Sequence, residues 1–274
     1  MSEPGADGAA RSRSLLPPLG WLRSGTSLEE IARRRSRDHQ PPTKALALRE
    51  VAAWCDMRWK AMRVPPLAPS RNPGCERPPI LVLPGFLASD LSTKPFREAL
   101  SARGWEVHGW GLGLNRGACH NMLGQVLELV DQIAVNGKVI LIGWSFGGLY
   151  AREVAKLRPH LVDRVITMGT PFSGDPRANN LWRTYEKVTG YKVDQTPFDV
   201  KLNEKPPVPT TALWSRGDGI VAPACARGLP NESDRRIQVN CSHIGYMTKT
   251  AVLERVLGLL PGPAPAPMRS TRPD

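Results

Sequence analysis

Residues 139–150 read Val-Ile-Leu-Ile-Gly-Trp-Ser-Phe-Gly-Gly-Leu-Tyr. The apolar, β-branched start predicts a buried strand, and the strand runs into the pattern Gly143-Trp144-Ser145-Phe146-Gly147. A strand, a tight turn and a helix in this order form a nucleophile elbow, which holds one serine in a strained backbone conformation at the top of a sheet. Glycine stands two residues before and two after that serine because the neighbouring chains come too close for a Cβ atom. Ser145 is therefore the candidate nucleophile.

A serine hydroxyl needs a general base within hydrogen-bond reach, and the base needs an acid that orients it. Among the five histidines, His243 has the fitting context, because it lies between a predicted strand and a predicted helix near the end of the chain. The acid candidate is Asp218, which glycines flank on both sides in the loop after an apolar run. The order serine, aspartate, histidine differs from the order in both major serine protease families. Asp175, in an earlier loop, is the alternative acid.

Acyl transfer passes through a tetrahedral oxyanion, which preformed backbone N–H groups stabilise. One donor is predicted at Phe146, the residue after the nucleophile. The second is expected in the loop Pro84-Gly85-Phe86-Leu87, which follows a predicted strand over residues 80–83. We assign this second donor to Phe86 and keep Leu87 as the alternative.

Strand-like runs alternate with helical stretches from residue 79 onward, and this predicts an α/β fold with a mainly parallel, doubly wound sheet. The ligand site of such a sheet lies beyond the carboxyl ends of its strands, where all three triad candidates fall. The predicted strands cover residues 80–83, 106–110, 139–143, 165–169, 211–214 and 236–239.

Residues 173–209 interrupt this alternation and are interpreted as a lid with a helix over residues 178–188. The segment carries several aromatic side chains, of which Trp182 and Phe198 are predicted to contact substrate. Leu87 and Trp144 are predicted to contact substrate from the body of the domain. Such side chains suit an acyl chain or an apolar alcohol, but they can equally serve to attach the lid to the body.

Together these motifs resemble the lipase and esterase branch of the α/β-hydrolase superfamily. The resemblance covers about residues 79–260, and it implies an α/β-hydrolase fold and a serine ester hydrolase that works through an acyl-enzyme. Many members have His-Gly where this chain has Pro84-Gly85, and Pro-Gly versions occur among lipases and lipid acyltransferases. Acyl transfer to an alcohol is therefore the alternative function, and a non-enzymatic binder on the same scaffold is a third. Besides the elbow, the resembling motifs are Leu83-Pro84-Gly85-Phe86, Gly169-Thr170-Pro171, Gly217-Asp218-Gly219-Ile220-Val221 and Ser242-His243-Ile244-Gly245.

The first 78 residues differ in composition from this hydrolase domain (79–260). Residues 1–42 are rich in Ser, Gly, Pro and Arg, and we expect a basic, poorly ordered arm. Residues 43–78 are expected to form a satellite helix and a Pro-rich linker, and residues 261–274 a flexible tail. The predicted apolar face of the satellite helix comprises Leu48, Val51, Ala52, Cys55, Trp59 and Met62.

The net charge is +12, and the first 78 residues contribute half of it. Arg33, Arg34, Arg35 and Arg37 most simply form a solvated tail, although weak contact with an anionic membrane stays open. No aromatic-interleaved motif accompanies this run, so no nucleic acid partner is expected. No apolar run approaches the length of a membrane span. One short stretch resembles a signal peptide, but its prolines make it a poor one. We expect a cytoplasmic protein; its oligomeric state is not indicated.

The five cysteines leave at least one thiol unpaired, and reduced thiols are the expectation in the cytosol. A bond between Cys225 and Cys241 is an alternative, because both lie close in sequence to the predicted acid and base. No Cys/His spacing indicates zinc, and no glycine-rich dinucleotide motif occurs. We therefore expect neither a metal nor a cofactor.

Overall fold

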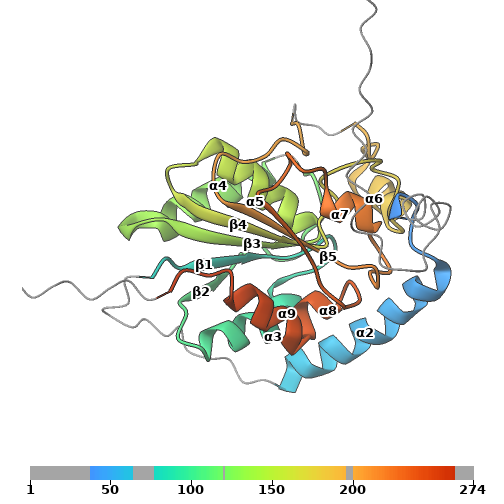
Figure 1. Ribbon diagram of the computed structural model, residues 1–274, viewed down its shortest axis with the longest axis horizontal. Coiled ribbons are helices and arrows are strands. Elements are labelled where there is room, and N and C mark those ends of the chain that lie inside the picture. Colours follow the sequence, from blue (N-terminus) through green and yellow to red (C-terminus); the bar gives the residue numbers. More distant parts are fainter. Residues whose placement is uncertain (1–37, 64–76, 120, 196–199, 263–274) are drawn as a thin grey trace, which may run out of the picture. The chain divides into compact units, whose positions relative to one another are not determined.

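The computed structural model describes residues 38–63, 77–119, 121–195 and 200–262. In this part of the chain one six-stranded sheet has the order β2-β1-β3-β4-β5-β6, and all neighbouring strands are parallel (Figure 1). The predicted α/β fold and all its strands are confirmed, with boundaries shifted by a few residues. The strands are β1 (Ile80–Leu83), β2 (Val107–Gly109), β3 (Val139–Trp144), β4 (Val162–Met168), β5 (Thr210–Trp214) and β6 (Arg235–Gln238).

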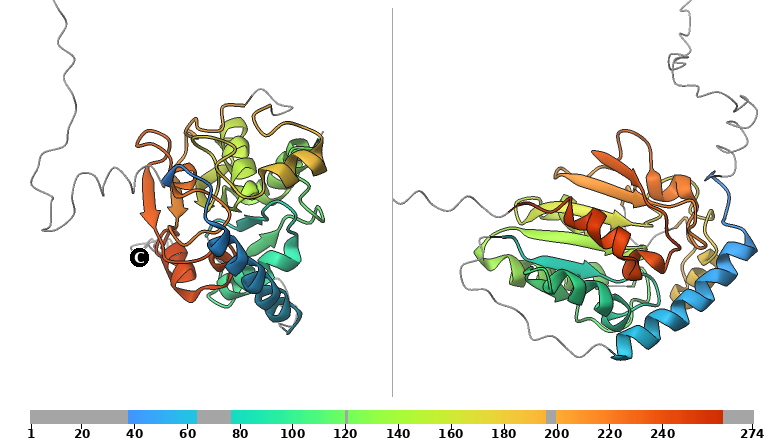
Figure 2. Two further views of the ribbon diagram at one scale, coloured as in Figure 1. Left: turned by 90° about the vertical axis from the view of Figure 1, so that its right-hand side faces the viewer. Right: turned by 60° about the horizontal axis from the view of Figure 1, so that its bottom comes forward.

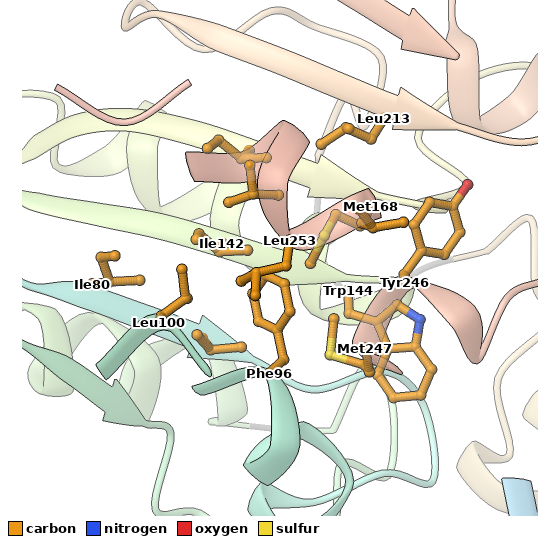
Figure 3. Packing of buried hydrophobic residues seen from close by; sticks show 14 of the residues in the cluster. Ile80, Phe96, Leu100, Ile142, Trp144, Met168, Leu213, Tyr246, Met247 and Leu253 are labelled. Carbon is orange, nitrogen blue, oxygen red and sulfur yellow. The ribbon is translucent and has the colours of Figure 1, made fainter. Parts of the chain in front are cut away.

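Helices cover both faces of the sheet (Figure 1). Successive strand residues pack into different cores on opposite faces. In β1, Ile80 and Val82 pack towards α3 and α9, whereas Leu81 and Leu83 pack towards α4 and α5. Figure 3 shows the first of these two cores. The helices are α2 (Lys44–Arg63), α3 (Asp90–Ser101), α4 (Met122–Ile133), α5 (Phe146–Leu157), α6 (Trp182–Thr189), α7 (Pro223–Arg227), α8 (Gly245–Thr248) and α9 (Thr250–Leu257), with a 3₁₀ turn at Ala134–Asn136.

Helix α2 packs against α3 and α8, but it buries a different face from the one predicted. Leu48 and Val51 are 71% and 62% exposed, whereas Glu50 and Met57 are 4% and 0% exposed. The predicted face was wrong because hydrophobic periodicity treats glutamate as a surface residue. Here Glu50 lies on the inner side of the helix, where backbone N–H groups of the domain bind its carboxylate.

Other predictions lie mostly outside the described residues, namely those for the arm, the linker and the C-terminal tail. Within the described part, no helix is both long and apolar enough to cross a membrane. Cys225 and Cys241 are buried free thiols, so no bond joins them in this structure.

Candidate active site

Ser145 occupies the turn between β3 and α5 with a φ of 53° and a ψ of −125°. A positive φ is strained for a residue other than glycine, and here close packing of the surrounding backbone holds it. A Cβ atom on Gly143 would overlap the backbone of Gly148, and one on Gly147 would overlap the carbonyl group of Leu83. This is the elbow geometry that the Gly-x-Ser-x-Gly pattern predicts.

His243 and Asp218 form a buried pair in the loops that follow β6 and β5. His243 Nδ1 lies 2.8 Å from Asp218 Oδ2. The other carboxylate oxygen, Oδ1, accepts hydrogen bonds from the backbone N–H groups of Ile220 at 2.8 Å and Val221 at 2.9 Å. These bonds fix the carboxylate with Oδ2 towards the imidazole. With Nδ1 donating to Asp218, Nε2 is the ring nitrogen that can take a proton.

The alternative acid, Asp175, has a different environment. It is exposed, and its Oδ1 accepts a hydrogen bond from the backbone N–H of Arg177 at 2.8 Å. The structure therefore brings Asp218, and not Asp175, to His243.

The groups around the imidazole set its protonation. Burial favours the neutral ring, but the charge and hydrogen bond of Asp218 and the charge of Glu50 outweigh burial and raise the pKa of His243. Burial also raises the pKa of the neighbouring Tyr246 well above its ordinary value and that of Cys241 to about 12, so both stay neutral near pH 7. Asp218 and Glu50 are thus the charges that favour the imidazolium form.

The loop after β1 and the start of α5 offer the N–H groups of Phe86 and Phe146. Leu87 does not, because its N–H donates to the backbone oxygen of Asn115 at 2.7 Å. Among the described residues, neither the Phe86 nor the Phe146 N–H donates to a protein acceptor. Phe146 is the first residue of its helix, so its N–H has no partner within the helix. The alternative donor Leu87 is excluded by this geometry.

Asn115 is a buried residue that the sequence analysis missed. Its side-chain Nδ2 donates to the Pro84 carbonyl oxygen at 2.8 Å, and its backbone N–H donates to the Ala88 carbonyl oxygen at 2.8 Å. With the bond from Leu87, these contacts fix the loop that carries Phe86. No motif in the sequence marks Asn115, because the carbonyl groups that its Nδ2 and its backbone N–H bind lie in a distant segment.

Within the described residues, a cavity of about 110 Å³ and another of about 380 Å³ meet at Ser145. The first is bordered by α6, whose Trp182 and Tyr185 line it. The second contains His243, and Trp54 of α2 forms part of its wall. Of the residues predicted to contact substrate, Leu87 and Trp144 line the second cavity and Trp182 the first, whereas Phe198 lies outside the described residues. Both cavities are lined by Phe86, Ser145, Leu181 and Ile220.

One family model and several solved structures resemble this chain. The family model of the PGAP1-like alpha/beta domain matches residues 105–207, a segment that includes Ser145 and ends before Asp218. The naproxen esterase (carboxylesterase NP) of Bacillus subtilis is 14% identical, with a TM-score of 0.51 over 76% of this chain and 97% of the esterase. The chain has the α/β-hydrolase fold. The resemblance read from its motifs is confirmed at this level.

Two further solved structures are similar to this chain. One is a chain from the work on LipS and LipT, two metagenome-derived lipolytic enzymes. It is 18% identical, with a TM-score of 0.49 over 68% of this chain and 97% of the matched chain. Polyneuridine aldehyde esterase is matched at 12% identity, with a TM-score of 0.49 over 67% of this chain and 99% of the other. The fold assignment rests on the Bacillus enzyme. No curated protein matches the sequence.

Proposed function

We propose that the protein is a serine carboxylic-ester hydrolase of esterase or lipase type, with Ser145 as nucleophile, His243 as base and Asp218 as its partner. The observation that carries the proposal is the buried His243–Asp218 pair at 2.8 Å, whose imidazole lines the same cavity as a serine at strained positive φ. A strained serine and an oriented imidazole that line the same cavity are the groups that nucleophilic catalysis requires.

The chemistry follows from these positions. His243 Nε2 takes the hydroxyl proton while Ser145 Oγ attacks the ester carbonyl carbon, and the N–H groups of Phe86 and Phe146 bind the oxyanion that forms. Collapse of this intermediate breaks the ester C–O bond, and the imidazolium gives its proton to the departing alcohol. A water molecule, deprotonated by His243, then attacks the acyl-enzyme, and the carboxylic acid leaves as Ser145 regains its proton.

The two cavities suit the two halves of such an ester. His243 must protonate the leaving alcohol, so the alcohol lies in the cavity of about 380 Å³ that contains the imidazole. The acyl chain then extends into the other cavity, between α5 and α6. Apolar side chains predominate on both walls, which suits an uncharged, apolar ester.

A second reading keeps the same triad and transfers the acyl group to an alcohol instead of water. The size of the cavity on the His243 side favours it, because an apolar alcohol bound there can occupy the place of the attacking water. Adding a medium-chain alcohol to the assay distinguishes the two: a transferase forms a new ester, and a hydrolase forms the acid alone.

The proposal is tested with a fluorophosphonate probe and a series of nitrophenyl esters. We expect one label per chain, located on Ser145 by mass spectrometry, together with release of nitrophenol. A label on a different residue would overturn the assignment of the nucleophile. Tight retention of an apolar ligand without labelling or turnover would identify the chain as a binder on a hydrolase scaffold.

Trp182 is expected to set selectivity for the length of the acyl chain, because it begins α6 and lines the acyl cavity. Trp182→Ala should change the ratio of kcat/KM for long against short acyl esters by about 10-fold, the usual scale for a changed apolar pocket. Tyr191→Ala is the matched control, since this exposed aromatic of the same segment lies outside that lining. Equal losses for all chain lengths would mean that Trp182 only attaches the segment to the body.

A further inference from the structure

Glu50 is a buried acidic residue on α2 whose carboxylate faces the active-site loops rather than solvent. It is 4% exposed. Its Oε1 accepts hydrogen bonds from the backbone N–H groups of Gly219 at 2.9 Å and His243 at 2.6 Å. Its Oε2 accepts one from the N–H of Ile244 at 3.0 Å. The carboxylate therefore bridges the loop that carries Asp218 and the loop that carries His243.

A buried charge is costly unless hydrogen bonds compensate it, and bonds to an ionised acceptor are stronger than neutral ones. Removing Glu50 would also leave the buried N–H groups of both loops without an acceptor. The chain makes room for this contact at Gly219, where a Cβ atom would come within 2.7 Å of Glu50 Cγ. The glycine after Asp218 is thus required by the approach of α2.

The backbone of His243 is held on both sides. Glu50 accepts its N–H, and the indole N–H of Trp144 donates to its carbonyl oxygen at 3.0 Å. The indole ring also lies against the imidazole, with ring centroids 5.6 Å apart. Glu50 of α2 and Trp144 of the elbow therefore hold the backbone of His243, whose side chain must reach Ser145.

We propose that Glu50 is a positioning residue of the active site: by binding both loops, it fixes Asp218 relative to His243 and sets the orientation of the imidazole. This inference rests on the proposed role of His243 as the base. It makes α2 a part of the active centre, which agrees with the place of Ala47 and Trp54 in the cavity wall; Figure 2 shows the helix in two views.

A second contact ties the same N-terminal segment to the acid loop. Asp38 is 3% exposed, and its carboxylate oxygens lie 2.7 Å and 3.1 Å from the guanidinium nitrogens of Arg216, two residues before Asp218. Asn180 Nδ2 donates to both the Pro42 and the Gly219 carbonyl oxygens, at 3.0 Å and 2.8 Å. The chain before α2 is therefore anchored beside the loop that Glu50 binds.

Glu50→Gln tests the inference because it keeps the size of the side chain but turns one acceptor oxygen into a donor that faces a backbone N–H. We expect kcat on a short nitrophenyl ester to fall by about 10- to 100-fold, the cost of a slightly misplaced catalytic group, while KM changes by less than about 3-fold. The acidic limb of the pH–rate profile should move to lower pH, because a negative charge that favours the imidazolium is lost.

Met57→Ala is the matched control, since Met57 is a fully buried residue of the same helix that packs in the core and lines neither cavity. It should lower Tm but leave kcat and the pH profile close to wild type at a temperature where the variant is folded. A Glu50→Gln variant that loses no more kcat than Met57→Ala, with an unmoved acidic limb, would overturn the positioning role.

If Glu50→Gln does not fold, Glu50→Asp provides the same test, because it keeps the charge and shortens the reach. Its kcat should fall while the acidic limb stays in place, and wild-type kcat in a folded Glu50→Asp would contradict the inference. Failure of the proposed function has a different signature. In that case wild type itself neither reacts with fluorophosphonate at Ser145 nor releases nitrophenol.

Discussion

Replacing Ser145 with alanine should lower kcat for ester hydrolysis by about 10⁴- to 10⁶-fold, the range for loss of a serine nucleophile from a triad. The residual rate reflects the oxyanion site and substrate binding, which the substitution leaves in place. The variant should stay folded, because alanine at this turn has the same strained φ and leaves the glycine packing unchanged. Initial rates with a short nitrophenyl ester and a thermal melt measure the two quantities.

Ser92→Ala is the control for this substitution. Ser92 is also a buried serine, but it lies on α3 and lines neither cavity. Its replacement should leave kcat within about 2-fold of wild type, as is usual away from the reacting groups. A Ser145→Ala variant that retains most of the wild-type kcat would show that the strained serine is not the nucleophile.

The inner strands were predictable because parallel strands, buried on both faces, read as continuous apolar runs, whereas the edge strands β2 and β6 are partly or largely exposed. All residues of β3 are buried, and their sequence is apolar throughout. The first residues of the helices were harder to predict from the sequence. Pro95 favours a helix start, but α3 begins at Asp90, whose carboxylate binds the N–H groups of Trp110 and Gly111 at 3.0 Å and 2.8 Å. That contact depends on tertiary structure, so no local pattern contains it.

The chemistry-bearing residues could be proposed from sequence, because a serine elbow demands particular residue types in a particular order. Glu50 and Asn115 could not, because each binds backbone N–H or carbonyl groups far along the chain, and backbone groups leave no mark on the sequence. The same limit explains the wrong face of α2. A glutamate is compatible with a buried face only where donors surround its carboxylate, and the fold alone creates that environment.

Asp218→Asn should lower kcat by about 10⁴-fold, because an amide in place of the carboxylate no longer selects the His243 tautomer with a free Nε2 or stabilises the imidazolium. Asp175→Asn should change kcat by less than about 3-fold, since its carboxylate binds only local backbone in an exposed turn. The pair is a matched test, because both substitutions remove one negative charge and keep the shape of the side chain.

The packing around the pair explains why the two aspartates should differ so much. At the end of β4, where the loop of Asp175 begins, Gly169 lies against the dyad: a Cβ atom there would be 3.0 Å from Asp218 Oδ2 and 3.1 Å from His243 Nδ1. Gly169 at the end of β4 thus packs against the His243 imidazole, and no space remains for a second carboxylate at Nδ1. A larger loss of kcat in Asp175→Asn than in Asp218→Asn would require this loop to rearrange on substrate binding and would move the acid to the earlier strand.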